Sequence, residues 1–350
     1  MAKKKYYDIS AILETKAQYM ILLGQRANGK SYQAKLTVLT NAYKTGRKFV
    51  YLRRWREDIK QRSVASYFGD MPVNKITKGE WDGIKTWNGD IYFYRLEGEE
   101  EIKSESIGKY CALNESERYK SWTFIDYDYI VFEEFITDKV YLMDEPRQLQ
   151  QFVSTVARNN AMTVLLIGNT LSRVCPYFNE WCLDGVLKQK QGTIEIYHHH
   201  VKDDTIDIAV EYCANVNTEN KMFFGQTAKQ IITGEWDTVD VPKLPRKQYE
   251  YEKIYEVLLT YQKFSFVIEL LVEPQNGGRL LHIYPYTGNR EIYRKITNEF
   301  SDLPNITSKL DITKRPEQLI VDCIRLDKIC YSDNMTGSDF KNVCNTFRFW

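Results

Sequence analysis

The stretch Gly24-Gln-Arg-Ala-Asn-Gly-Lys-Ser31 (GQRANGKS) determines how the rest of this 350-residue sequence is interpreted. It matches the pattern G-x-x-x-x-G-K-[ST], in which a glycine-rich backbone wraps around a phosphate chain. The lysine of such a loop reaches the outer phosphates, and the hydroxyl ligates Mg²⁺. We therefore expect a nucleoside triphosphate and Mg²⁺ to be held by consecutive residues, namely Gly24, Gln25, Arg26, Ala27, Asn28, Gly29, Lys30 and Ser31.

Apolar runs and helical stretches alternate on both sides of this loop. Tyr19–Leu23 (YMILL) is typical of a buried parallel strand, and a helix is expected from Lys30 to Tyr43, with its N-terminal dipole facing the phosphates. Other expected elements are strands at Lys48–Leu52, Tyr129–Phe132 and Thr163–Ile167, a hairpin around Asn88-Gly89, and a helix at Glu145–Arg158. This order predicts an α/β fold with a mostly parallel sheet.

Two carboxylates end one of the apolar runs, Tyr129-Ile-Val-Phe-Glu-Glu134. We expect Glu133 to hold the Mg²⁺ shell and Glu134 to orient or deprotonate the attacking water. Most loops of this kind are paired with Asp at the first position, so the longer Glu133 changes the metal distance. Asn169 follows the next strand and is a candidate for sensing the γ-phosphate or placing water. The alternatives are solvated acids at a strand end and a turn-forming Gly-Asn pair.

Positive side chains form a second group of candidates. Arg53, Arg54 and Arg56 surround Trp55 at the end of the Lys48–Leu52 strand. Guanidinium groups beside an indole suit nucleic-acid phosphates and bases, so we expect a DNA contact here. A solvated basic edge is the alternative. Arg158 follows the expected helix, and its spacing alone favours an ordinary surface arginine.

Composition excludes several classes of protein. The 48 Lys and Arg nearly balance the 47 Asp and Glu, which excludes a uniformly basic nucleic-acid binder but allows a local basic surface. The sequence contains no apolar run of about 18 residues, so no membrane span is expected. The charged start Met-Ala-Lys-Lys-Lys is not expected to be a signal peptide. The seven scattered cysteines form no CxxC pair, so reduced thiols in a cytoplasm are expected.

The change in the pattern of apolar and polar segments along the chain predicts two domains joined by a linker. Residues 1–205 carry the strand–helix alternation, residues 206–250 are a linker region, and residues 251–350 form a small α+β domain. In the last part we expect a hairpin of Phe264–Val272 and Arg279–Tyr284, with helices near Pro316–Leu326 and Asp339–Phe347. The candidate carboxylates for a two-metal nuclease site in this part are Glu269, Glu273 and Asp322, but their spacing in the sequence does not support such a site.

Several segments, in order, resemble the genome-packaging ATPases of small, short-tailed bacteriophages that infect Gram-positive hosts and prime replication with a terminal protein. They are Gly24–Lys35, Phe49–Ile59, Ile130–Ile136, Thr155–Asn159 (TVARN) and Cys175–Phe178. The similarity is strong to about residue 180. Beyond it, a segment from Phe224-Gly225 to Gly234-Glu235 and the 264–284 hairpin still align.

The resemblance implies an ASCE-type P-loop ATPase domain that uses ATP and Mg²⁺. It also implies that the C-terminal domain is a vestigial RNase H-type nuclease that docks on nucleic acid or the portal. The family forms a homopentameric ring on a phage procapsid and pumps double-stranded DNA inward. The implied partners are therefore viral DNA, other copies of this chain, the portal and procapsid and, as an open point, a packaging RNA. The implied location is the host cytoplasm, transiently on the procapsid.

The resemblance also assigns residues. The arginine that acts in trans in the family falls on Arg158, and its DNA-facing basic residue falls on Arg56. A second trans-acting basic residue falls on Arg118 or Lys120, and the alignment does not choose between them. The glutamate at Glu133 is the main departure from the family's active site.

Two other functions remain as alternatives. One is a DNA-translocating ATPase of the conjugation or chromosome-transfer type, although such chains are usually longer and often carry membrane segments. The other is a P-loop kinase acting on a small molecule, which would not need the Glu133-Glu134 pair because its acceptor replaces water. A DNA-binding scaffold with an inactive loop is disfavoured by the complete Gly29-Lys30-Ser31.

Overall fold

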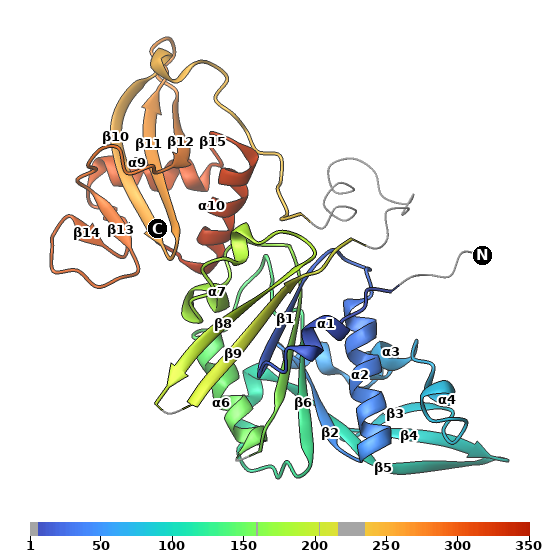
Figure 1. Ribbon diagram of the computed structural model, residues 1–350. Helices are drawn as coiled ribbons and strands as arrows, with labels where there is room; N and C mark the ends of the chain where they lie inside the picture. Colours follow the sequence, from blue (N-terminus) through green and yellow to red (C-terminus); the bar gives the residue numbers. More distant parts are fainter. Residues whose placement is uncertain (1–5, 159, 203, 216–234) are drawn as a thin grey trace. The chain divides into compact units, whose positions relative to one another are not determined.

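A computed structural model describes residues 6–158, 160–202, 204–215 and 235–350 (Figure 1). The chain divides into two compact units. The first comprises Met1–Thr137, Leu142–Thr170 and Pro176–Glu235, and the second comprises Asp138–Tyr141, Leu171–Cys175 and Trp236–Trp350. Of the aligned segment that begins at Phe224-Gly225, the part up to Gly234 lies outside the described residues.

The first unit is built on a sheet that has nine strands within the described ranges, in the order β3-β4-β5-β2-β6-β7-β1-β9-β8. Neighbouring strands run parallel from β5 to β9 in this order, and the hairpins at both edges are antiparallel. The strands are β1 (Tyr19–Gly24), β2 (Lys48–Arg53), β3 (Gly83–Trp87), β4 (Asp90–Glu97), β5 (Glu100–Ala112), β6 (Tyr127–Glu133), β7 (Thr163–Asn169), β8 (Thr193–Val201) and β9 (Asp204–Tyr212). The predicted mostly parallel α/β sheet is confirmed.

Helices cover both faces of this sheet, which is why its central strands are apolar throughout. On one face α2 contributes Val38 and Leu39 to the core that contains Leu22. On the other face Tyr177 of α7 meets Phe132 of β6 edge to face. The helices of this unit in its described part are α1 (Ser10–Glu14), α2 (Lys30–Thr45), α3 (Gln61–Phe68), α4 (Val73–Ile76), α5 (Ser116–Tyr119), α6 (Glu145–Ala157) and α7 (Pro176–Glu180).

The helix α2 ends at a glycine, and the order of three strands determines where the loop between β1 and α2 lies. Gly46 ends α2 with a left-handed φ of +71°, and its N–H donates to the Ala42 carbonyl. β7 lies between β1 and β6. Parallel strands bring their carboxyl ends to one edge, so the residues that follow β1, β6 and β7 meet there.

The second unit has its own sheet, which comprises six strands among the described residues in the order β14-β13-β10-β11-β12-β15. Its elements are β10 (Glu252–Tyr261), β11 (Phe264–Val272), β12 (Arg279–Pro285), β13 (Lys295–Thr297), β14 (Ile306–Thr307), β15 (Ile329–Tyr331), α9 (Arg315–Arg325) and α10 (Asn334–Thr346). The expected hairpin is β11–β12 and the expected helices are α9 and α10. These helices supply Ile320, Val321, Phe340 and Val343 to a core with one face of the sheet.

Within the described ranges, no helix combines the length and apolar character needed to span a membrane. The seven cysteines carry free thiols.

Candidate nucleotide site

The loop between β1 and α2 depends on glycine at a position of close approach. Gly29 has a φ of +101°, and a Cβ there would lie 2.8 Å from the Cβ of Tyr6. Ala27 also has a positive φ, of 58°. Left-handed backbone and close packing together require glycine at Gly29 and turn the loop onto the N-terminus of α2.

Lys30 lies inside this loop. Its side chain is buried, and Nζ donates to the Gln25 carbonyl at 2.6 Å. Nζ also lies 3.4 Å from Oδ1 of Asn169, at the end of β7. Burial lowers the pKa of Lys30 to about 8, and the nearby Cys213 and Glu133 partly oppose this shift. The start of α2 and the end of β7 thus bring Lys30 and Asn169 together, as a sensor of an outer phosphate requires.

Glu133 lies at the end of β6 and is buried. Its Oε1 accepts a hydrogen bond from the Tyr67 hydroxyl at 2.5 Å, and the Ser31 hydroxyl donates to the same carboxylate. Burial raises the pKa of Glu133, while the hydrogen bonds from Tyr67 and Ser31 act in the opposite direction. A hydroxyl and a carboxylate in contact are hard oxygen donors, so Ser31 and Glu133 fit a Mg²⁺ ion.

Glu134 follows directly and has a different environment. Its φ is +57°, a left-handed conformation that is strained for a residue with a side chain. The carboxylate is exposed, and its Oε2 accepts a hydrogen bond from Arg53 Nη2 at 2.6 Å. Arg53 ends β2, the neighbour of β6. The structure therefore makes Arg53 the partner of the candidate base, a role that the sequence analysis did not assign to it.

A cavity of about 310 Å³ joins these groups. Most of the expected phosphate-site residues line it: Arg26, Ala27, Asn28, Gly29, Lys30, Ser31, Glu133, Glu134 and Asn169. Six further lining residues were not predicted as site residues: Ile167 and Gly168, which directly precede Asn169, and Tyr6, Tyr32, Lys35 and Asp70. Lys35 forms an ion pair with Asp70, and its Nζ donates to the Tyr67 carbonyl. Lys35 lies four residues after Ser31 on the same helix, and this spacing is the signal that could have found it.

The other two arginines near β2 occupy unlike positions. Arg54 is buried and binds Glu145 through two hydrogen bonds, from Nε at 2.7 Å and Nη2 at 3.0 Å. Its guanidinium also donates to the Glu134 and Phe135 carbonyls. The expected DNA contact does not fit this internal position of Arg54. Arg56 is exposed and forms an ion pair with Glu115 at the surface.

Glu115 connects two of the basic candidates. Arg56 Nη1 lies 2.6 Å from Glu115 Oε1, and Arg118 Nη1 lies 3.7 Å from its Oε2. Both arginines line a second cavity, of about 330 Å³. Lys120 instead pairs with Glu117 at 2.6 Å. Arg118 is therefore the trans-acting candidate that shares an acid with Arg56.

Arg158 lies at the C-terminal end of α6. Its side chain is exposed and Nη2 donates to the Trp122 carbonyl at 3.0 Å. Its φ is +49°. Within the part of the chain that the structure describes, Arg158 is not one of the residues lining the 310 Å³ cavity. Its position leaves the guanidinium facing outward.

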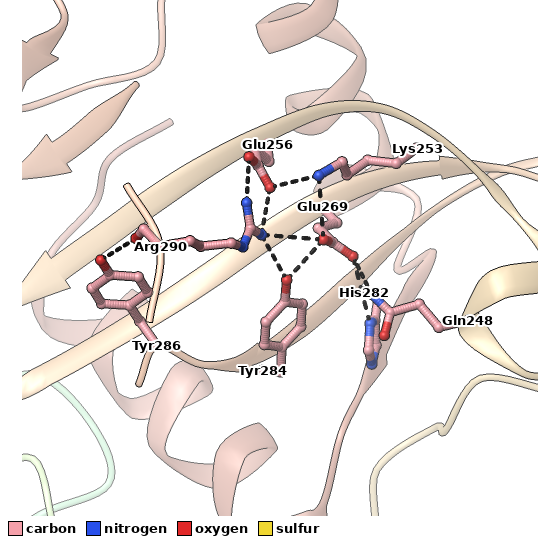
Figure 2. Close-up of polar contacts among 8 residues, drawn as sticks. All are labelled: Gln248, Lys253, Glu256, Glu269, His282, Tyr284, Tyr286 and Arg290. Carbon is pink, nitrogen blue, oxygen red and sulfur yellow. Dashed lines mark hydrogen bonds and ion pairs between the residues drawn. The ribbon is translucent and has the colours of Figure 1, made fainter. Parts of the chain in front are cut away.

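The carboxylates noted in the C-terminal part have separate partners. Glu269 of β11 accepts from the Tyr284 hydroxyl at 2.7 Å and from Gln248 Nε2 at 2.6 Å (Figure 2). Glu273 pairs with Arg246 at 3.3 Å, and Asp322 lies on α9. Over the described residues, no group of three or more His, Cys, Asp or Glu side chains is arranged to hold a metal ion.

Comparison with known proteins decides the family. Residues 1–198 match the family model of the podovirus DNA encapsidation protein (Gp16), which is more than half of the 350 residues. The chain belongs to this family. All residues that line the 310 Å³ cavity lie within the segment matched to the encapsidation protein family.

Individual proteins are also similar to this chain. The DNA packaging proteins of Bacillus phages PZA and phi29 are each 27% identical over 187 residues, which is 51% of this chain and 50% of theirs. The alignment thus spans about half the length of these curated relatives. A chain of the bacteriophage Phi-29 viral genome packaging motor assembly has a similar fold, with a TM-score of 0.56 at 18% identity, covering 98% of this chain and 99% of that chain.

Proposed function

We propose that this chain is the ATP-hydrolysing subunit of a ring motor that drives double-stranded viral DNA into a procapsid. The observation that carries the proposal is the meeting of the phosphate-binding loop with Glu133 and Glu134 around one cavity. β7 between β1 and β6, with a catalytic glutamate after β6, supports an ATPase of the ASCE type. Membership of the DNA encapsidation family supports viral DNA as the substrate that is moved.

Different residues of the chain carry out different parts of the proposed ATP hydrolysis. The loop N–H groups and Lys30 bind the phosphates. Ser31 and Glu133 would hold Mg²⁺, which neutralises phosphate charge when it is bound. Glu134 orients or deprotonates the attacking water, and Asn169 senses the outer phosphate. Arg53 Nη2 donates to Oε2 of Glu134 at 2.6 Å and orients this carboxylate at the edge of the cavity.

The remaining basic residues act outside this cavity in the proposed motor. Arg56 contacts the DNA backbone, where a guanidinium can bind phosphate without reading sequence. Arg158 completes the site of a neighbouring subunit, and Arg118 or Lys120 adds a second positive charge there. Its outward-facing guanidinium supports this role for Arg158. The motor is then a homopentamer on the portal of a procapsid in the host cytoplasm, with packaging RNA as a further candidate partner.

We infer a vestigial RNase H-type fold for the second unit. Five of its strands, β12-β11-β10-β13-β14, form an antiparallel three-strand sheet extended by two strands parallel to β10. This strand order and these directions are those of RNase H-type nucleases, which supports the inference. The separate partners of Glu269 and Glu273 support a role in gripping nucleic acid or docking on the portal in place of metal-dependent cleavage.

DNA-stimulated ATP hydrolysis tests the proposed function. The purified full-length chain should hydrolyse ATP in the presence of Mg²⁺, and double-stranded DNA should raise the rate. The conjugation-type alternative predicts the same stimulation, so packaging into purified procapsids separates the two motors. Phosphate transfer to a small acceptor, with no DNA effect, would favour the kinase. A folded protein that hydrolyses no ATP with or without DNA contradicts the proposal.

A further inference from the structure

Two tyrosine rings form one wall of the nucleotide cavity. Tyr6 and Tyr32 stack with ring centroids 4.0 Å apart and an angle of 8° between their planes. Both line the 310 Å³ cavity together with the phosphate-binding loop. Both are half-buried, so part of the aromatic surface is accessible. The catalytic roles assigned above use neither ring.

The backbone holds Tyr6 against the loop. The Tyr7 N–H donates to the Asn28 carbonyl at 2.8 Å, and the Tyr7 hydroxyl donates to the buried Oε1 of Glu211 at 2.7 Å. Tyr6 also packs on Gly29, where a Cβ would lie 2.8 Å from the Tyr6 Cβ. The ring of Tyr6 is therefore fixed beside the phosphate site although it lies far from the loop in sequence.

The loop sets the direction of a bound triphosphate. Lys30 and Asn169 mark the end where the outer phosphates belong, because Nζ reaches Oδ1 at 3.4 Å there. The loop N–H groups at the start of α2 take the inner phosphates. The nucleoside continues away from Lys30, and Tyr32 is the first residue after Ser31 along the helix.

We propose that the stacked rings of Tyr6 and Tyr32 form the platform on which the base of the bound nucleotide stacks. Aromatic faces bind any base through its π-face, and such stacking contributes substantially to the binding of nucleotides. The platform therefore gives the site its preference for a nucleoside triphosphate over a bare polyphosphate chain. This inference rests on the proposed nucleotide-binding function.

Calorimetric titration of the full-length chain with two probes tests the platform. The probes are ATP and inorganic tripolyphosphate, each with Mg²⁺, and the variants are Tyr32→Ala and Tyr6→Ala. Each alanine variant should raise the Kd for ATP about tenfold, which equals about 1.4 kcal/mol. The Kd for tripolyphosphate should stay unchanged, because that probe has no base to stack.

Matched variants separate the ring from other effects. Tyr32→Phe and Tyr6→Phe keep the π-face and should bind ATP as the unmodified chain does. Tyr32→Leu keeps bulk without a π-face and replaces Tyr32→Ala where the alanine variant does not fold. An equal loss of ATP and tripolyphosphate affinity overturns the platform, because the rings then only hold the loop in shape. Unchanged ATP affinity in the alanine variants overturns it as well.

The two levels of the hypothesis fail in different ways. If the unmodified, folded chain binds neither probe, the nucleotide site itself is wrong and the platform falls with it. If it binds both probes with equal affinity, the phosphate site stands and the platform is wrong.

Discussion

Each ionisable group at the nucleotide site has a specific neighbour that sets its charge or its direction. Burial lowers the pKa of Lys30 and raises that of Glu133, so each shift disfavours the charged form. Glu134, by contrast, is exposed and is held by Arg53. The two residues are adjacent and identical, yet their environments differ, as the proposed roles of a metal-holding and a water-handling acid require.

Lys30→Ala should abolish ATP hydrolysis with little loss of stability. The ammonium makes polar contacts to Gln25 and Asn169, so no apolar core is disturbed by its removal. ATP turnover and thermal unfolding are measured on the same preparation. Lys44→Ala, in the exposed last turn of the same helix, is the control and should hydrolyse ATP normally. Normal turnover in folded Lys30→Ala protein would refute the site assignment.

Glu134→Gln should bind ATP with Mg²⁺ but hydrolyse it about 10²–10⁴ times more slowly, the usual effect of losing a general base. The amide keeps the shape of the side chain and loses its basicity. Binding is measured by titration and turnover by phosphate release. Glu133→Gln is the matched comparison, and it should weaken Mg²⁺-dependent binding. The reverse pattern, lost binding in Glu134→Gln alone, would exchange the two roles.

At the scale of helices and strands, continuous apolar runs were the predictable part. β1, β6 and β7 are buried among other elements, so their runs identify them without knowledge of their neighbours. β9 (Asp204–Tyr212) was not predicted, because polar residues interrupt its apolar run. It pairs with β1 and extends the first unit past residue 205. The order of strands is a tertiary property. Nothing local in the sequence says that β2 lies beside β6, which is what brings Arg53 to Glu134.

In the second unit, three strands align ionisable groups in one row. Glu256 of β10 faces Glu269 of β11, and Glu269 faces His282 of β12. Two opposed carboxylates repel each other, and both Arg290 and Lys253 form ion pairs with them. Nη1 and Nη2 of Arg290 each donate to a Glu256 oxygen at 2.6 Å (Figure 2). The hydrogen bonds from Arg290 are the main cause that lowers the pKa of Glu256.

Arg290→Gln should therefore lower the free energy of unfolding of this unit at neutral pH by about 1–3 kcal/mol, the usual contribution of hydrogen bonds to a charged group. Among the described residues, the Glu256 carboxylate then keeps only its hydrogen bond from Lys253. Because the folded pKa of Glu256 is lowered, its stabilising effect is present above the ordinary carboxyl pKa and is lost as pH falls through the lowered value. Urea unfolding at neutral and acidic pH should show a difference from the unmodified chain that shrinks in acid. The exposed Arg279→Gln is the control. A pH-independent difference would contradict this assignment.

For the whole molecule, the question is which groups need a second copy of the chain. The cavity brings together the loop residues, two acids and Asn169 from one chain. Among the described residues, neither Arg158 nor Arg118 lines it. An arginine that reaches the γ-phosphate contributes about 10³–10⁵ in rate to related phosphoryl transfers. If Arg158 is that group and acts on a neighbouring subunit, ATP hydrolysis requires that subunits assemble.

Arg158→Ala should bind ATP nearly normally, because the loop, Ser31 and Glu133 remain in cis, but it should not hydrolyse it. Mixing this variant with Glu134→Gln gives the decisive measurement, since each is inactive alone. Where an Arg158→Ala subunit holds ATP and a Glu134→Gln neighbour donates its intact arginine, one site has every group it needs. ATPase activity should then partly return in the mixture. A lack of recovery in demonstrably mixed assemblies would assign Arg158 to its own subunit or to the fold, and it would remove the main reason for this ATPase to work as a ring.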